Sequence, residues 1–174
     1  MEDSGHLVAK HWALVAFGSN VGDRVRHILD ALRLLRSWVR IEASSGFYET
    51  APMYVEDQPP FLNGAVLIET DLGPQSLLKI LKDIEARIGR QARERNGPRE
   101  IDLDLIDAEG VTEATDGLTL PHPRAYERRF VLEPLNEIAP DWVLRGYGTV
   151  CDLLARPDVQ SQEVRRTADA PVLI

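Results

Sequence analysis

The stretch from Gly97 to Ile106, GPREIDLDLI, constrains the fold more than any other part of the chain. Apolar residues at positions 101, 103 and 105 alternate with charged residues at 100, 102 and 104. This period of two predicts a strand with one buried face and one polar face. Asp102 and Asp104 then point to the same side, with their Cα atoms about 7 Å apart.

Two neighbouring carboxylates repel each other where water is scarce, and a shared proton or a cation relieves that repulsion. Magnesium takes carboxylate oxygens and often brings phosphates with it. The acidic strand is therefore a candidate metal site, and its alternative is a strand with a solvated acidic face. Glu100 lies on the same side of the strand and could be a further ligand, but we expect it to be exposed to solvent.

A loop rich in arginine precedes the acidic strand. The planar guanidinium group binds phosphate through two parallel hydrogen bonds, and the loop contains Arg90, Arg93, Arg95 and Arg99. Its middle, from Gln91 to Asn96, is expected to be mobile and able to close over phosphates. A solvated charged loop is the alternative, but arginines beside paired carboxylates favour phosphoryl chemistry.

The pattern of apolar residues predicts strands at 12–17, 42–50 and 61–70, with Gly46 marking a bulge, and a central strand that follows the arginine loop and runs to Ile106. Helices are expected after the cap Asp23 and between Pro74 and Gly89. The order strand, helix, strand, strand, helix, strand is that of a ferredoxin-like βαββαβ core, an α+β fold with an antiparallel sheet. Later segments predict a short strand at 118–120, a helix at 124–135 that Pro134 ends or kinks, and a helix at 149–155.

The length of 174 residues suits one domain, 1–174, in which 1–11 and 156–174 are loose or peripheral. A net charge of −8 argues against a nucleic-acid partner. The single cysteine excludes an intrachain disulfide and fits the reducing cytoplasm. The first eleven residues do not read as a signal peptide, and no apolar run approaches the ~20 residues of a membrane span.

Two further groups are candidates for ligand binding. His122 is followed by Arg124, Arg128 and Arg129, and since the last two are adjacent on a helix, at most one of them faces a site well. Phe61 and Asn63 could hold a flat heterocycle, because the aromatic ring can stack on it and the amide can hydrogen-bond to its edge. Phe61 could equally well be a residue of the hydrophobic core. The turn at 18–23 lacks the P-loop pattern and is taken as a tight turn with a helix cap.

Five segments together resemble the 6-hydroxymethyl-7,8-dihydropterin pyrophosphokinases of folate biosynthesis. They are FGSNVGDR (17–24), FYETAPMY (47–54), QPPFLNGAV (58–66), GPREIDLDLI (97–106) and LPHPRAYERRFVLEPLNEIAP (120–140). The resemblance implies a three-layer αβα fold with extra C-terminal helices. It also implies that the hydroxymethyl oxygen of the pterin attacks the β-phosphorus of ATP, so that pyrophosphate is transferred and AMP leaves.

The same resemblance implies roles for individual residues. Asp102 and Asp104 match a pair that binds two Mg²⁺ ions, and Arg90 and Arg99 match arginines that stabilise the transferring phosphates. The remaining implied positions contact ATP (Lys82, Glu85, Leu105, Thr119, His122, Arg128) or the pterin (Thr50, Ala51, Met53, Phe61, Asn63, Phe130). ATP and the pterin are the expected partners of a monomer.

The loop from Arg90 to Arg99 departs from the family pattern. Asn96 stands where many relatives have tryptophan, and the loop is a residue shorter than in some of them, so the roles of Arg93 and Arg95 stay open. Two other functions fit parts of the sequence. A ferredoxin-like binding module would hold a nucleotide without producing AMP, whereas RNA binding on a four-stranded sheet is disfavoured by the acidic charge and the missing aromatic motif.

Overall fold

The computed structural model describes residues 7–52, 57–93, 95 and 97–171. Its main sheet runs in the order β10-β3-β4-β1-β5, with β2 also paired to β4, and every pairing is antiparallel. The strands are β1 (Leu7–Ser19), β2 (Arg40–Ser44), β3 (Phe47–Thr50), β4 (Phe61–Leu72), β5 (Asp102–Ala108) and β10 (Arg165–Ala168). The predicted antiparallel sheet of a mixed α and β protein is confirmed.

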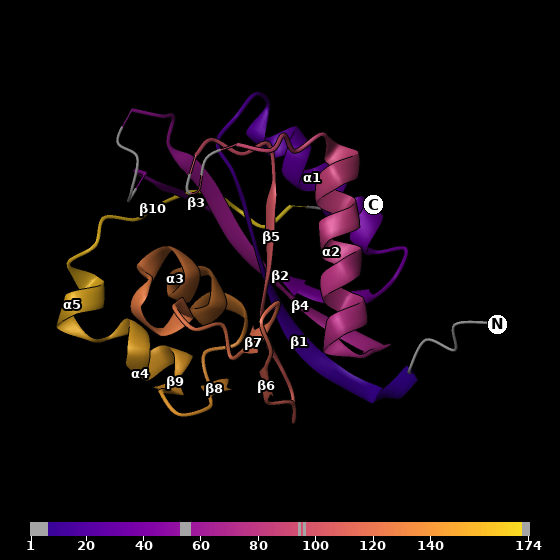
Figure 1. Ribbon diagram of the computed structural model, residues 1–174. Coiled ribbons are helices and arrows are strands. Elements are labelled where there is room, and N and C mark those ends of the chain that lie inside the picture. Colours follow the sequence, from indigo (N-terminus) through magenta and orange to yellow (C-terminus); the bar gives the residue numbers. More distant parts are fainter. Residues whose placement is uncertain (1–6, 53–56, 94, 96, 172–174) are drawn as a thin grey trace.

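Helices lie on both sides of this sheet (Figure 1). One side carries α1 (Arg24–Leu35) and α2 (Pro74–Ile88), and the other carries α3 (Arg129–Ile138), α4 (Val150–Leu154) and α5 (Pro157–Gln160). Short elements complete the chain: β6 (Glu113–Ala114) pairs with β7 (Thr119–Leu120), β8 (Val143–Leu144) pairs with β9 (Gly148–Thr149), and the 3₁₀ turn η1 (Ala125–Glu127) precedes α3.

The central strand β1 is buried on both faces. Val15 and Phe17 pack into the core under α1 and α2, whereas Leu14 and Ala16 pack into the second core under α3 and α4. A strand covered on both sides needs apolar residues at every position, which explains the unbroken apolar run in the sequence. β5 is different, because its Leu103 and Leu105 enter the first core while Asp102 and Asp104 point to the opposite side.

The predicted helix ends are confirmed. The Asp23 side chain accepts a hydrogen bond from the Arg26 backbone N–H at 3.1 Å, as an N-cap does. Pro74 is the first residue of α2, and Gly89 ends it with φ of 101°, a left-handed conformation that glycine adopts readily.

The strand predicted at 42–50 is divided in two by Ser45 and Gly46. Both the N–H and the hydroxyl of Ser45 bond to the backbone of Ala65, each at 2.9 Å, so the chain stays attached to β4 through the break. A side chain on Gly46 would collide with the carbonyl oxygen of Ala168. The glycine therefore admits β10 to the edge of the sheet rather than only bulging a continuous strand.

Three other expectations need correction. Residues 7–11, expected to be loose, form the start of β1, and 156–171 contain α5 and β10, which the sequence analysis did not predict. The helix expected at 124–135 is a 3₁₀ turn followed by α3, and Pro134 lies inside α3 without ending it. Burial of Leu132 and Leu135 outweighs the backbone hydrogen bond that the proline cannot make. Over the described residues, no helix is long and apolar enough to cross a membrane.

Candidate active site

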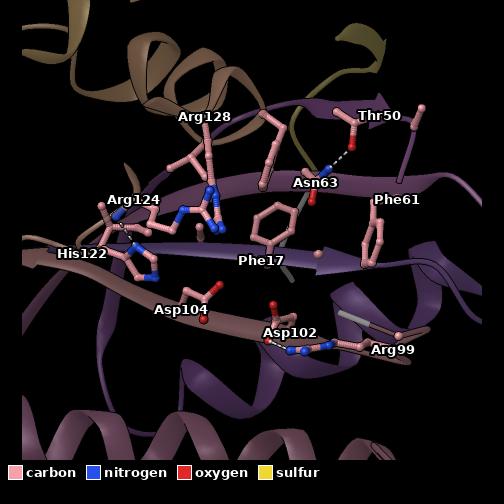
Figure 2. Close-up of a pocket in the computed structure, with 18 of the residues that line it drawn as sticks. Phe17, Thr50, Phe61, Asn63, Arg99, Asp102, Asp104, His122, Arg124 and Arg128 are labelled. Atoms are coloured by element: carbon pink, nitrogen blue, oxygen red, sulfur yellow. Dashed lines mark hydrogen bonds and ion pairs between the residues drawn. The ribbon is translucent and has the colours of Figure 1, made fainter. Parts of the chain in front are cut away.

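A cavity of about 410 Å³ opens on the α3 side of the sheet (Figure 2). Its wall combines the end of β1, the β3–β4 pair, β5, the arginine loop, and the turn from His122 to η1. Ten of the residues proposed from the sequence or the resemblance line it: Thr50, Ala51, Phe61, Asn63, Arg99, Asp102, Asp104, His122, Arg128 and Phe130. The fold therefore gathers segments from 50 to 130 around one space.

The acidic pair points into this cavity from β5, which confirms that both carboxylates share one face (Figure 2). The partners of Asp102 and Asp104 on β1 are Gly18 and Ala16, residues with little or no side chain. Burial, together with the neighbouring Asp102 carboxylate, raises the pKa of Asp104 above its usual range. The pair is thus short of positive charge on the Asp104 side.

Asp102, by contrast, is held by two arginines. Its Oδ1 lies 3.0 Å from Arg90 Nη1 and 3.3 Å from Arg99 Nη1. Arg90 also lies 2.5 Å from Glu85 Oε2, and the other oxygen of Glu85 accepts a hydrogen bond from the Leu103 backbone N–H at 2.8 Å. Glu85 therefore joins α2 to β5 and holds Arg90 against the acidic pair.

Several implied nucleotide positions lie outside the cavity wall. Lys82 is paired with Glu85 at 3.1 Å, and Leu105 is buried in the core under the helices with 3% exposure. Thr119 is an exposed residue of β7. Met53 lies outside the described residues.

The arginine loop folds back onto its own strand. Arg95 and Arg99 line the cavity, whereas Arg93 pairs with Glu100 at 2.7 Å. Glu100 is buried, not exposed as expected. Burial raises the pKa of Glu100, but hydrogen bonds from the backbone and from Arg93 outweigh this effect, and the pKa lies below its usual value.

His122 faces Asp104 across the cavity (Figure 2). Its Nδ1 accepts a hydrogen bond from the Arg124 backbone N–H at 3.2 Å, which leaves the proton on Nε2. Burial, followed by the charge of Arg128, lowers the pKa of His122 to about 4, so the ring is neutral at pH 7. Arg128 points into the cavity while Arg129 pairs with Glu133 at 2.9 Å, as the argument from adjacent helix positions predicted.

The other end of the cavity is aromatic and amide-lined. Asn63 Nδ2 donates to Thr50 Oγ1 at 2.8 Å, which fixes the orientation of the buried amide. A Cβ on Gly18 would lie 2.7 Å from Asn63 Oδ1, so only glycine fits beside this amide. Phe61 and Phe130 line the same space, which suits a flat, hydrogen-bonding ring.

Arg124, named with His122 from the sequence, lines the cavity as well. Sequence reasoning did not select Phe17, Gly18 or Gln58 as site residues, although all three line the cavity. The signal for the first two was present in FGSN, at the end of a buried strand. The side-chain amide of Asn20, in the same motif, donates to Gln58 Oε1 at 2.9 Å and to Pro59 O at 3.0 Å, and accepts from the Arg99 N–H at 2.7 Å. It ties the loop before β4 to the arginine loop.

No group of three or more His, Cys, Asp or Glu side chains within the described ranges is arranged to hold a metal ion. The protein thus offers two carboxylates and leaves the remaining positions around a cation to other oxygen donors. Such a donor set suits a hard cation that shares its ligands with phosphates. Acidic and basic groups at one end and an aromatic clamp at the other define a site for a phosphate donor beside a heterocycle.

The chain belongs to the 7,8-dihydro-6-hydroxymethylpterin-pyrophosphokinase (HPPK) family, whose model matches residues 14–140. One relative is the 2-amino-4-hydroxy-6-hydroxymethyldihydropteridine pyrophosphokinase of Methylorubrum extorquens. It is 43% identical over 148 residues, which are 84% of this chain and 93% of that protein. The folate synthesis bifunctional protein of Pisum sativum is 48% identical over 72% of this chain.

The chain spans 20% to 24% of the length of several relatives, including the Pisum sativum protein and a folic acid synthesis protein of Dictyostelium discoideum. Among solved structures, it resembles the HPPK-DHPS protein of Plasmodium falciparum with pteroate. The TM-score is 0.69 at 16% identity, over 83% of this chain and 44% of that one. This likeness supports the fold.

Proposed function

We propose that this protein transfers pyrophosphate from ATP to the hydroxymethyl group of 6-hydroxymethyl-7,8-dihydropterin and releases AMP, a step of folate biosynthesis. The hydroxymethyl oxygen forms a bond to the β-phosphorus and loses its proton. The bond from that phosphorus to the oxygen bridging the α- and β-phosphates breaks, and this oxygen leaves with AMP. The observation that carries the proposal is the single cavity in which an acidic pair and arginines lie opposite an aromatic and amide clamp.

The pterin ring lies in this proposal between Phe61 and Phe130, with Thr50, Ala51 and the Asn63 amide at its edge. Asn63 presents Oδ1 as an acceptor because its Nδ2 is already bonded to Thr50. An acceptor next to stacked rings selects a heterocycle with N–H donors. Met53 is proposed to complete this half of the site.

The phosphates lie in this proposal between β5 and the turn from His122 to Arg128. Arg99 and Arg128 bind phosphate oxygens, and neutral His122 donates from Nε2. Arg90 leaves Asp102 when phosphates offer it oxygen acceptors. Fixed cations and donors around a transferring group stabilise the charge that develops on it and hold the reacting atoms in line.

Magnesium suits the two carboxylates, since the half-buried Asp104 stands beside a second negative charge. Asp102 and Asp104 would hold two Mg²⁺ ions, and the ions would neutralise charge on the triphosphate. Of the other nucleotide positions, Glu85 and Lys82 act through Arg90 and β5, while Leu105 and Thr119 remain proposals from the resemblance.

The same proposal extends to the whole chain. In this proposal residues 1–174 are one domain with a ferredoxin-like core between two helical layers and added C-terminal helices, and the antiparallel sheet with helices on both sides supports it (Figure 1). The protein acts in the cytoplasm as a monomer, and ATP and the pterin are its partners, with neither nucleic acid nor membrane involved.

Product analysis tests the reaction. The protein is mixed with ATP, Mg²⁺ and 6-hydroxymethyl-7,8-dihydropterin, and AMP is separated from ADP by chromatography. We expect AMP that depends on the pterin and disappears with a chelator. ADP instead would indicate a simple kinase, and bound ATP without either product would indicate a nucleotide-binding module.

Asp102→Asn tests the acidic pair. The variant keeps the size of the side chain and removes one charge from the proposed metal site. We expect turnover to fall by at least about a hundredfold, because charge neutralisation of the phosphates supplies several kcal/mol. The matched control is Asp71→Asn, a β4 carboxylate outside the cavity wall, and equal rates in the two variants would contradict the assignment.

A further inference from the structure

The segment at the C-terminal end of α5 touches the backbone on both sides of Arg128. This segment, residues 160–162, lies beyond the 14–140 range that the family model matches. It consists of the last residue of α5 and the two residues after it, and α5 lies on the same side of the sheet as α3 (Figure 1). None of its residues lines the cavity.

Gln162 makes two hydrogen bonds that bracket Arg128. Its Oε1 accepts from the Arg129 backbone N–H at 2.9 Å, and its Nε2 donates to the Glu127 carbonyl at 2.7 Å. A carboxamide presents a donor and an acceptor side by side, as the peptide group of a neighbouring strand does. The pairing therefore holds Arg128 in the extended conformation seen there, with φ of −107° and ψ of 111°.

The start of α3 needs such a partner. The first N–H groups of a helix have no acceptor within it, and the cap residue Arg128 makes no capping bond with its own side chain. Gln162 supplies the acceptor from 33 residues away. The helix entry is thus set by the C-terminal segment.

Arg129 fastens the same segment in return. Its Nη1 donates to the carbonyls of Gln160 and Gln162 at 3.0 and 2.8 Å. The two adjacent arginines therefore have different partners: Arg129 binds residues 160–162, and Arg128 faces the cavity.

We propose that Gln162 is a positioning residue for Arg128. By holding the backbone on both sides of it, Gln162 presents the guanidinium to the phosphates of the nucleotide. The inference rests on the proposed function, in which Arg128 binds ATP. It assigns a part in nucleotide binding to a residue that never touches the nucleotide.

Nucleotide affinity without turnover tests this inference. Binding of the α,β-methylene analogue of ATP, in which the bond broken in the proposed reaction is blocked, is measured with Mg²⁺ by calorimetry for the full chain and for Gln162→Met. This variant keeps the side-chain length and removes both bracketing hydrogen bonds, together with a longer one from Nε2 to the Asp158 carbonyl at 3.5 Å. We expect roughly tenfold weaker binding, about 1.4 kcal/mol, because Arg128 is no longer held toward the phosphates. The matched control is Gln160→Met, whose Nε2 donates only to the Leu154 carbonyl in the same segment, and it should bind normally.

The double variant separates positioning from general structural support. In an Arg128→Met background, Gln162→Met should cost no further affinity if it acts through Arg128. A full additional loss would overturn the inference, and so would unchanged affinity in Gln162→Met, whatever happens to its melting temperature. Unchanged affinity in Arg128→Met alone would also overturn it, while pterin-dependent AMP formation by the wild-type protein would still stand as a separate result.

A second substitution covers the case in which Gln162→Met fails to fold. Gln162→Glu keeps an acceptor for the Arg129 N–H and loses the donor to Glu127. We expect an intermediate loss of affinity, and wild-type affinity in this variant would count against the role of the Glu127 bond.

Discussion

At the scale of single residues, His122 shows how burial sets a charge state. Its neutral ring lies among arginines, and its pKa falls from 6.5 in water to about 4 in the fold. Between pH 6.5 and pH 4, His122 is protonated in the unfolded chain but stays neutral in the folded protein. Folding stability contributed by His122 is therefore complete above pH 6.5 and is lost as the pH falls toward 4.

Comparison with His122→Gln measures this dependence. The free energy of unfolding of the wild type, relative to the variant, should drop by roughly 2 kcal/mol between pH 6.5 and 4 once screening by solvent is allowed for. Urea titrations at several pH values give the difference. Parallel curves for the two proteins would show that the ring is protonated normally.

The residue scale also shows what the sequence can predict. Asp102 and Asp104 were placed on one face correctly because strand alternation depends only on neighbouring residues. Glu100 belongs to the same alternation but is buried, since Arg93 folds back from the loop to pair with it. No local pattern contains that contact.

At the scale of elements, Asn20 connects the turn after β1 to two loops around the cavity. Replacing it with alanine removes three side-chain hydrogen bonds and leaves the Arg99 N–H without its acceptor. We expect a loss of about 2–3 kcal/mol of stability. Amide hydrogen exchange should become faster in peptides covering 57–60 and 97–100.

Ser19→Ala is the matched control for this change. Ser19 is equally buried, but its hydroxyl has no hydrogen-bond partner within the described part of the chain. The variant should be neutral or slightly more stable. If exchange in the two loops is the same for both variants, Asn20 does not connect them.

Element boundaries were predictable where they depend on local chemistry. Asp23 and Pro74 mark the starts of α1 and α2, and Gly89 marks the end of α2. Each acts through a contact within one turn or through its own backbone conformation. β10 was not predictable, because Arg-Arg-Thr-Ala is exposed throughout and has no apolar alternation. Its strand conformation depends on β3, more than a hundred residues earlier.

At the scale of the whole molecule, Glu137 joins three parts of the fold. Its carboxylate on α3 accepts hydrogen bonds from the Gly46 N–H at 3.0 Å and the Tyr48 hydroxyl at 2.5 Å, and pairs with Arg166 of β10 at 3.0 Å. Burial, followed by the hydrogen bond to Glu137, raises the pKa of Tyr48 to about 12. One carboxylate thus holds a helix, a strand connection and the sheet edge together.

Glu137→Ala should lower the free energy of unfolding by about 2–3 kcal/mol, because Gly46 and Tyr48 lose their partner. Urea denaturation followed by circular dichroism gives the value. Glu133→Ala, which breaks a single ion pair with Arg129 on the same helix and, among the described residues, leaves no part of the sheet without a partner, should cost within about 1 kcal/mol. Equal losses would mean that Glu137 makes no special connection.

The place of β10 in the chain has a consequence for synthesis. Its partner β3 is complete after Thr50, yet the strand that covers the outer edge of β3 begins only at Arg165. While the ribosome makes the intervening residues, that edge keeps its backbone groups unpaired. Uncovered edges invite pairing with other chains. The edge of β3 is therefore open to misassembly until β10 has been synthesised.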